Sequence, residues 1–170
     1  KMSKSLGNFY TLRDLLEKGH SPRSIRYLLV SAHYRKQYNF TLEGIGQADQ
    51  ALARIDNLLV RLRDVKKDGP ADAAVRDLCG KMIADFTEAV DDDLNISRGL
   101  GVFFEFAHDV NTLINDGKLA RADCDGILET LKTLDAVLGV IFFEDPARKE
   151  IDAAWVESMI AERIAAKKGK

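Results

Sequence analysis

Two lysines at the start of the chain have the spacing and the neighbours of a loop that contacts phosphate groups. Lys1 and Lys4 stand three positions apart in Lys1-Met2-Ser3-Lys4-Ser5, and the small serines allow close backbone approach. A lysine on such a loop can offset the negative charge that grows on phosphates when an α-phosphorus is attacked. Gly7 supplies the conformational freedom that a closing loop needs. The alternative is an ordinary basic N-terminal arm, in which serine and lysine are also common.

Metal chemistry has little support in the sequence. His20, His33, Cys79 and Cys124 show no paired spacing typical of metal ligands, so we predict no metal site and reduced cysteines. The acidic run at residues 91–93 could bind a cation. A charged turn before a capped helix explains it without one, and we favour that interpretation.

A second group of basic residues could follow an RNA backbone. Arg54 and Arg61 are seven positions apart, which places them on one face of an expected helix, opposite its apolar stripe. The candidate RNA contacts are Arg26, Arg35, Lys36, Arg54 and Arg61. Such arginines also form salt bridges or cover a solvated face, and for Arg54 and Arg61 both interpretations stay open. For Arg26, inside an apolar helix, we favour a structural ion pair with a neighbouring helix.

The charge of the chain is unevenly distributed. The net charge is -2, but residues 1–70 carry 13 Lys or Arg against 7 Asp or Glu, whereas residues 71–170 carry 12 against 20. A polyanionic partner should therefore meet the first seventy residues. Chance variation over one long surface is the alternative.

Helix signals follow the opening loop along almost the whole chain. Thr11, Ser21 with Pro22 behind it, Thr41 and Asn95 are predicted N-caps. The expected helices cover about residues 11–19, 21–34, 41–67, 75–89, 95–113, 121–138 and 152–164. We find no alternating strand pattern of useful length.

The long helices predict how the chain folds. Four amphipathic helices joined by short breaks within residues 41–140 favour an antiparallel bundle. With 46% hydrophobic and 31% charged residues, the 170-residue chain resembles a soluble globular domain. No apolar run approaches the ~20 residues that a membrane helix needs.

The opening residues resemble the cysteinyl-tRNA synthetases, a family of class I aminoacyl-tRNA synthetases. The pentapeptide is the signature loop of that class, and Leu6-Gly7-Asn8-Phe9 and Thr11-Leu12-Arg13-Asp14-Leu15-Leu16 are similar to the family's next turn and short helix. Further similarity lies at residues 25–35, 91–106 and 155–168. Ser21 departs from the family, which usually has an acidic residue there. The resemblance covers the whole chain and is sharpest in residues 1–40.

The resemblance implies an all-α fold. We expect an antiparallel helical bundle of the DALR-type anticodon-binding kind, preceded by the signature loop and short stem-contact helices. Residues 1–40 would form the end of the catalytic region, residues 41–145 the tRNA-binding bundle, and residues 146–170 the start of a C-terminal helical appendage.

The resemblance also assigns roles to the opening loop. Lys4 matches the second signature lysine, which contacts ATP in this family, and is therefore the expected catalytic residue. Lys1, Met2, Ser3 and Ser5 shape the ATP-binding loop around it.

The implied enzyme is a cysteine–tRNA ligase. It would form cysteinyl-adenylate from cysteine and ATP with Mg²⁺, then transfer cysteine to tRNA(Cys), as a cytoplasmic monomer without membrane or DNA partners. The family's adenine-binding motif and zinc ligands are expected in a catalytic domain upstream, so we expect a C-terminal piece that is inactive alone. Two alternatives remain: a piece of the related ligase that joins cysteine to an aminosugar, and a free-standing helical RNA- or protein-binding module.

Overall fold

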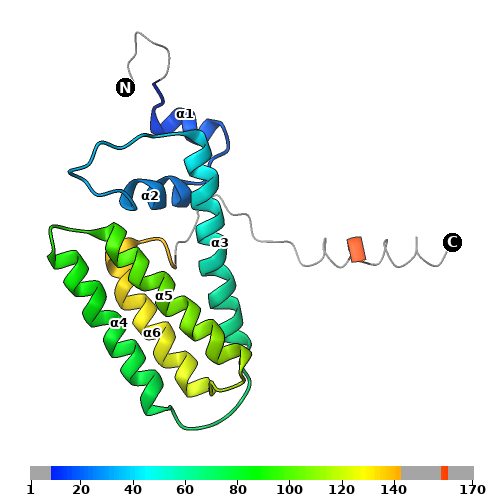
Figure 1. The fold of residues 1–170 in the computed structure, drawn as a ribbon. Coiled ribbons are helices and arrows are strands. Elements are labelled where there is room, and N and C mark those ends of the chain that lie inside the picture. Colours follow the sequence, from blue (N-terminus) through cyan, green and yellow to red (C-terminus); the bar gives the residue numbers. More distant parts are fainter. Residues whose placement is uncertain (1–8, 143–157, 161–170) are drawn as a thin grey trace.

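The computed structural model describes residues 9–142 and 158–160, and residues 9–142 form six helices joined by loops (Figure 1). The helices are α1 (Leu12–Glu17), α2 (Pro22–Val30), α3 (Leu42–Asp64), α4 (Ala73–Asp91), α5 (Ile96–Asn115) and α6 (Arg121–Leu138). Residues 158–160 are also helical, and the rest of the helix expected at 152–164 lies outside the described residues. The predicted all-α fold is confirmed for the described part of the chain.

Side-chain caps fix where most helices begin. Thr11 and Asp14 form a reciprocal capping box at α1, with the Thr11 N–H 2.7 Å from the Asp14 carboxylate. Hydrogen bonding of the Asp14 carboxylate to the Thr11 backbone N–H, and to the Thr11 side chain, lowers the pKa of Asp14. The predicted caps at Ser21, Thr41 and Asn95 are confirmed, because each side chain accepts a backbone N–H of the first turn.

The end of α2 differs from the sequence-based expectation, whereas α6 begins at Arg121 as predicted. α2 stops at Val30 with Ser31 as its C-cap, whereas the sequence predicted an end near Tyr34. Tyr34 instead hydrogen-bonds to the α4–α5 turn, a contact that local sequence does not reveal. α6 begins after Ala120, and the buried carboxylate of Asp123 accepts the backbone N–H groups of Ala120 and Asp72.

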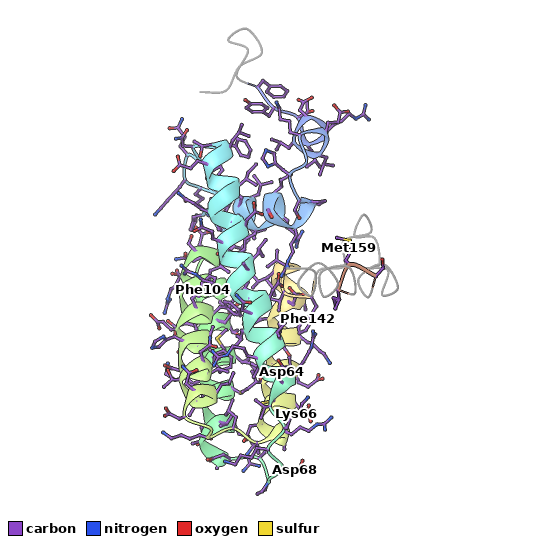
Figure 2. All side chains as sticks on the ribbon, turned by 90° about the vertical axis from the view of Figure 1, so that its right-hand side faces the viewer. Asp64, Lys66, Asp68, Phe104, Phe142 and Met159 are labelled. Atoms are coloured by element: carbon purple, nitrogen blue, oxygen red, sulfur yellow. The ribbon has the colours of Figure 1, made fainter. Side chains whose placement is uncertain are left out.

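The long helix α3 joins two parts of the molecule. Its N-terminal half packs against α2, and its C-terminal half packs against α5 and α6 (Figure 1). Asp64, Lys66 and Asp68 mark the end of α3, from which the chain turns towards α4 (Figure 2). α4 covers the other side of α5 and α6, which completes a four-helix bundle.

Successive helices of the bundle run in opposite directions, as predicted (Figure 1). α3 and its neighbour α5 therefore run in the same direction. Arg61 contacts Asn111, and six residues later Lys67 donates to the Gly117 carbonyl at 2.9 Å. The apolar stripes meet in one continuous core. Its largest fully buried side chains include Ile45, Ile55, Leu58, Leu62, Phe103, Val110, Ile127, Leu131, Leu134 and Leu138.

Two glycines allow close approaches that hold the core together. A Cβ on Gly99 would lie 3.0 Å from the Phe86 ring, so glycine lets α5 approach α4 closely. Gly139 ends α6 with a φ of 61°, and a Cβ there would lie 2.9 Å from the Arg26 guanidinium. Gly139 thus opens the space that Arg26 uses.

No helix in the described residues is long and apolar enough to cross a bilayer.

Candidate functional site

The opening residues that the sequence predicts to contact phosphate groups lie outside the described residues. This applies to Lys1, Met2, Ser3, Lys4 and Ser5 alike, so their assigned roles remain predictions. The described residues begin at Phe9, and α1 begins at Leu12.

The basic residues after α2 meet an acidic turn of the bundle. The Tyr34 hydroxyl donates to Asp93 at 2.5 Å, and Arg35 Nε lies 2.8 Å from the same carboxylate. The hydrogen bond to Asp93 raises the pKa of Tyr34. Asp93 and Leu94 both have positive φ angles, 55° and 54°, in the turn between α4 and α5. Arg35 is therefore partly neutralised, whereas Lys36 is exposed in the same loop.

Arg26 contacts the end of α6 rather than a carboxylate. Its Nε donates to the Leu138 carbonyl at 2.8 Å, so the ion pair expected from the sequence is replaced by a hydrogen bond. The last carbonyls of a helix lack intrahelical partners and carry partial negative charge, which attracts a guanidinium. Arg26 thus has a structural contact with a neighbouring helix, although of a different kind.

Arg61 is held in place without being neutralised. One Nη donates to Asn111 and the other to the Asn115 side-chain oxygen at 2.6 Å. The Asn111 amide is itself oriented by donating to the Ala107 carbonyl at 2.8 Å. Because both acceptors are neutral amides, the guanidinium keeps its full positive charge in an ordered position.

Arg54 lies about two helical turns before Arg61 on α3. It is exposed, and no carboxylate of the described residues lies within ion-pair distance of it. It borders a groove between α3 and α5 whose other lining residues are Ile55, Phe103, Phe104, Ala107, His108 and Asn111. None of these lining residues is acidic. The groove therefore combines an uncompensated cation with neutral polar and aromatic groups.

Sequence reasoning missed the α5 side of this groove. Phe104 on α5 is half-buried: it packs against the core and also borders this groove next to α3 (Figure 2). His108, Asn111 and Asn115 follow Phe104 at steps of four, three and four, a polar stripe that could have been found. From the sequence alone, this polar stripe on α5 could not be distinguished from a solvent-exposed face, because the sequence does not show that α3 packs beside α5.

No group of three or more metal-ligating side chains occurs in the described part of the chain. Cys79 is half-buried, Cys124 is buried, and both are free thiols. Burial raises the pKa of the Cys124 thiol.

Two family models match the chain in different places. The model described as "tRNA synthetases class I (C) catalytic domain" matches residues 1–50, and the one described as "DALR domain" matches residues 85–143. The first covers the signature loop, α1, α2 and the start of α3. The second covers the end of α4 with α5 and α6.

Curated relatives match the whole chain. A cysteine–tRNA ligase from Chlamydia abortus is 40% identical over 171 residues, and one from Brachyspira hyodysenteriae is 38% identical over 174; each alignment includes all of this chain. A third, from Chlamydia pneumoniae, is 44% identical over 142 residues, which is 83% of the chain. By sequence, the chain is homologous to a segment of the cysteine–tRNA ligases. It spans about a third of the length of these ligases, 30–36% in the three named.

Proposed function

We propose that this chain forms part of an enzyme that activates cysteine with ATP and joins it to tRNA(Cys). The observation that carries the proposal is one alignment, at 40% identity, that contains both the opening pentapeptide and the helical bundle of this chain. Relatives of that name from three bacterial genera also align with the whole chain. The family resemblance implies ATP as a substrate with Mg²⁺, and we leave any zinc site to the part of the ligase outside this chain.

In this proposal Lys4 provides the charge of the opening loop. Negative charge moves onto the departing pyrophosphate when the cysteine carboxylate attacks the α-phosphorus of ATP. A lysine that meets the phosphates only after the loop closes stabilises this transition state more than the ground state. Lys1, Met2, Ser3 and Ser5 then determine how closely the loop backbone approaches ATP.

The bundle supplies the tRNA contacts. Arg54 and Arg61 present positive charge along α3 that no neighbouring carboxylate cancels, and phosphates are the natural partners of such charges. Lys36 extends the positive surface towards α2. Arg26 and Arg35 contribute less in this scheme, because each already makes a contact within the protein. We propose that the ligase acts as a cytoplasmic monomer.

A chimeric enzyme tests this proposal. The chain replaces the matching segment of the Chlamydia abortus ligase, and cysteine-dependent ATP–pyrophosphate exchange and tRNA(Cys) aminoacylation are both measured. We expect both activities, and we expect Lys4→Ala to lower exchange by roughly 100-fold, the scale typical of losing one transition-state donor. Lys132→Ala, which removes an exposed lysine from α6, is the matched control.

A folded chimera that neither activates cysteine nor charges tRNA(Cys) would contradict the proposal. Full exchange activity in Lys4→Ala would contradict only the role proposed for Lys4, and not the proposed function of the chain. The unfused chain should catalyse no exchange, because it spans only about a third of its relatives.

A further inference from the structure

The short segment that follows α6 is held on both sides of its backbone. The N–H groups of Val140, Ile141 and Phe142 donate to the Asp135 carboxylate at 2.7, 2.7 and 2.9 Å. The side chains of Val140 and Ile141 are buried in the core. Residues 139–142 therefore form an ordered, non-helical anchor at one end of the bundle.

Two arginines of α2 donate hydrogen bonds to backbone carbonyls at the end of α6 and in this anchor. Arg26 Nε donates to the Leu138 carbonyl at 2.8 Å, and Arg23 Nε donates to the Val140 carbonyl at 2.6 Å. A second nitrogen of Arg23 lies 3.3 Å from the Ile141 carbonyl. We call Arg23, Arg26 and Asp135, together with the carbonyls that they hold, the α2–α6 clamp.

Arg23 also ties the clamp to α3. Its guanidinium makes a two-pronged contact with Asp56, with both N–O distances at 2.9 Å, while its side chain is 15% exposed. A mostly buried guanidinium is tolerated only when its donors are satisfied, and this one serves three elements at once. Arg23 thus links α2, α3 and the end of α6 through one side chain.

A second connection lies at the same end of the bundle. Tyr34 and Arg35, just after α2, both hold Asp93 in the α4–α5 turn. The turn and the end of α6 both face α2 (Figure 1). Because the α2 region contacts the bundle at two separate points, the angle between them is fixed. A single contact would allow rotation about that point.

The two matched family regions meet at these connections. Arg23, Arg26 and Tyr34 fall in the region that matches the catalytic-domain model, whereas Asp93 and Asp135 fall in the DALR region. We propose that the α2–α6 clamp and the Tyr34–Asp93 bond are positioning devices that set the angle between the catalytic part and the tRNA-binding bundle. This inference rests on the function proposed above.

The geometry of α3 explains why a small change of angle matters. At a rise of about 1.5 Å per residue, the part of α3 from Asp56 to Asp64 is about 12 Å long, so a rotation of about 10° at the clamp moves the end of the helix by about 2 Å. A displacement of about 1 Å at reacting atoms can already cost about 100-fold in rate. Loosening the clamp should therefore harm transfer to tRNA and leave cysteine activation intact.

The test uses the chimeric ligase with Arg23→Met and Tyr34→Phe combined. These changes remove the donors and keep the apolar parts of both side chains. Tyr38→Phe, on an exposed tyrosine of the same loop, is the control. We expect kcat/KM for aminoacylation to fall roughly ten- to hundredfold and exchange to stay within about twofold. In the otherwise unchanged chimera, Arg23→Lys should lower kcat/KM for aminoacylation less than Arg23→Met alone does.

Parallel losses of exchange and aminoacylation would show a merely structural role, and unchanged aminoacylation would show no role; either result overturns the inference. A starting chimera that charges no tRNA(Cys) would contradict the proposed function itself, which separates the two failures.

A distance measurement on the chain alone makes a second test. Spin labels at Arg13→Cys on α1 and Lys118→Cys after α5, with Cys79→Ser and Cys124→Ala, should give a narrow distance distribution. Arg23→Met with Tyr34→Phe should broaden it while the far-ultraviolet circular dichroism stays unchanged. An equally narrow distribution at the same distance would overturn the inference.

Discussion

At the scale of single residues, the molecule separates arginines that hold the fold from arginines that remain available. Arg23 and Arg26 donate hydrogen bonds to backbone carbonyls, and Arg23 also pairs with Asp56. Arg61 donates its hydrogen bonds to the neutral side-chain amides of two asparagines, which fix the position of the guanidinium without neutralising its charge. Arg54 makes no ion pair within the described residues. Burial and exposure alone would not reveal this difference, because it depends on the chemical nature of each acceptor.

Neutralising Arg61 without removing it tests this distinction. Asn115→Asp places a carboxylate where the amide oxygen now accepts from the guanidinium, and it leaves the Asn111 amide unchanged, so the fold should be kept while the charge is cancelled. We expect affinity for tRNA(Cys) to fall roughly tenfold at low salt, and the slope of log affinity against log salt to decrease by about one. Fluorescence anisotropy of labelled tRNA at several salt concentrations measures both.

The control is Thr112→Asp, which adds the same charge at another exposed position in the last turn of α5. Equal losses in both variants would mean that only the net charge of the bundle matters. In that case the ordered position of Arg61 would have no special importance.

At the scale of elements, local signals predicted the start of a helix better than its end. Thr11, Ser21, Thr41 and Asn95 cap helices because their side chains reach backbone N–H groups only two or three residues away. The end of α2 depends on Asp93, far along the chain, so no local pattern could place it. The groove beside Arg54 escaped prediction for the same reason, since its second wall is another helix.

Two glycines of α5 give a matched pair for testing the helix packing. A Cβ at Gly99 would press on the Phe86 ring at 3.0 Å, whereas a Cβ at Gly101 would meet no atom within 4 Å. We expect Gly99→Ala to lower the free energy of unfolding by about 1–3 kcal/mol through overpacking. Gly101→Ala should raise it by up to about 1 kcal/mol, because alanine favours the helix. Urea denaturation of both variants measures the difference, and equal changes would contradict the close approach of α4 and α5.

At the scale of the whole molecule, charge and connectivity support the same function. The first seventy residues are basic, the remainder is acidic, and α3 carries the uncompensated arginines into the bundle. The family match at residues 1–50 lies at one end of α3, and the DALR match covers most of the bundle at the other. This arrangement suits a helix that connects a catalytic part to an RNA-binding part. The resemblance to cysteine–tRNA ligases was recognisable from the opening residues, whereas the contacts between α2 and the bundle required the structure.

The most direct test of this account is the binding of the chain to tRNA(Cys) and to an unrelated tRNA at two salt concentrations. We expect preference for tRNA(Cys), weaker binding at higher salt, and a salt slope lowered by about two in Arg54→Ala with Arg61→Ala. Arg76→Ala with Lys132→Ala removes the same charge elsewhere on the bundle and should change the slope little. Equal binding of both tRNAs, or no effect of the α3 arginines, would contradict the claim that this bundle contacts tRNA(Cys) through α3.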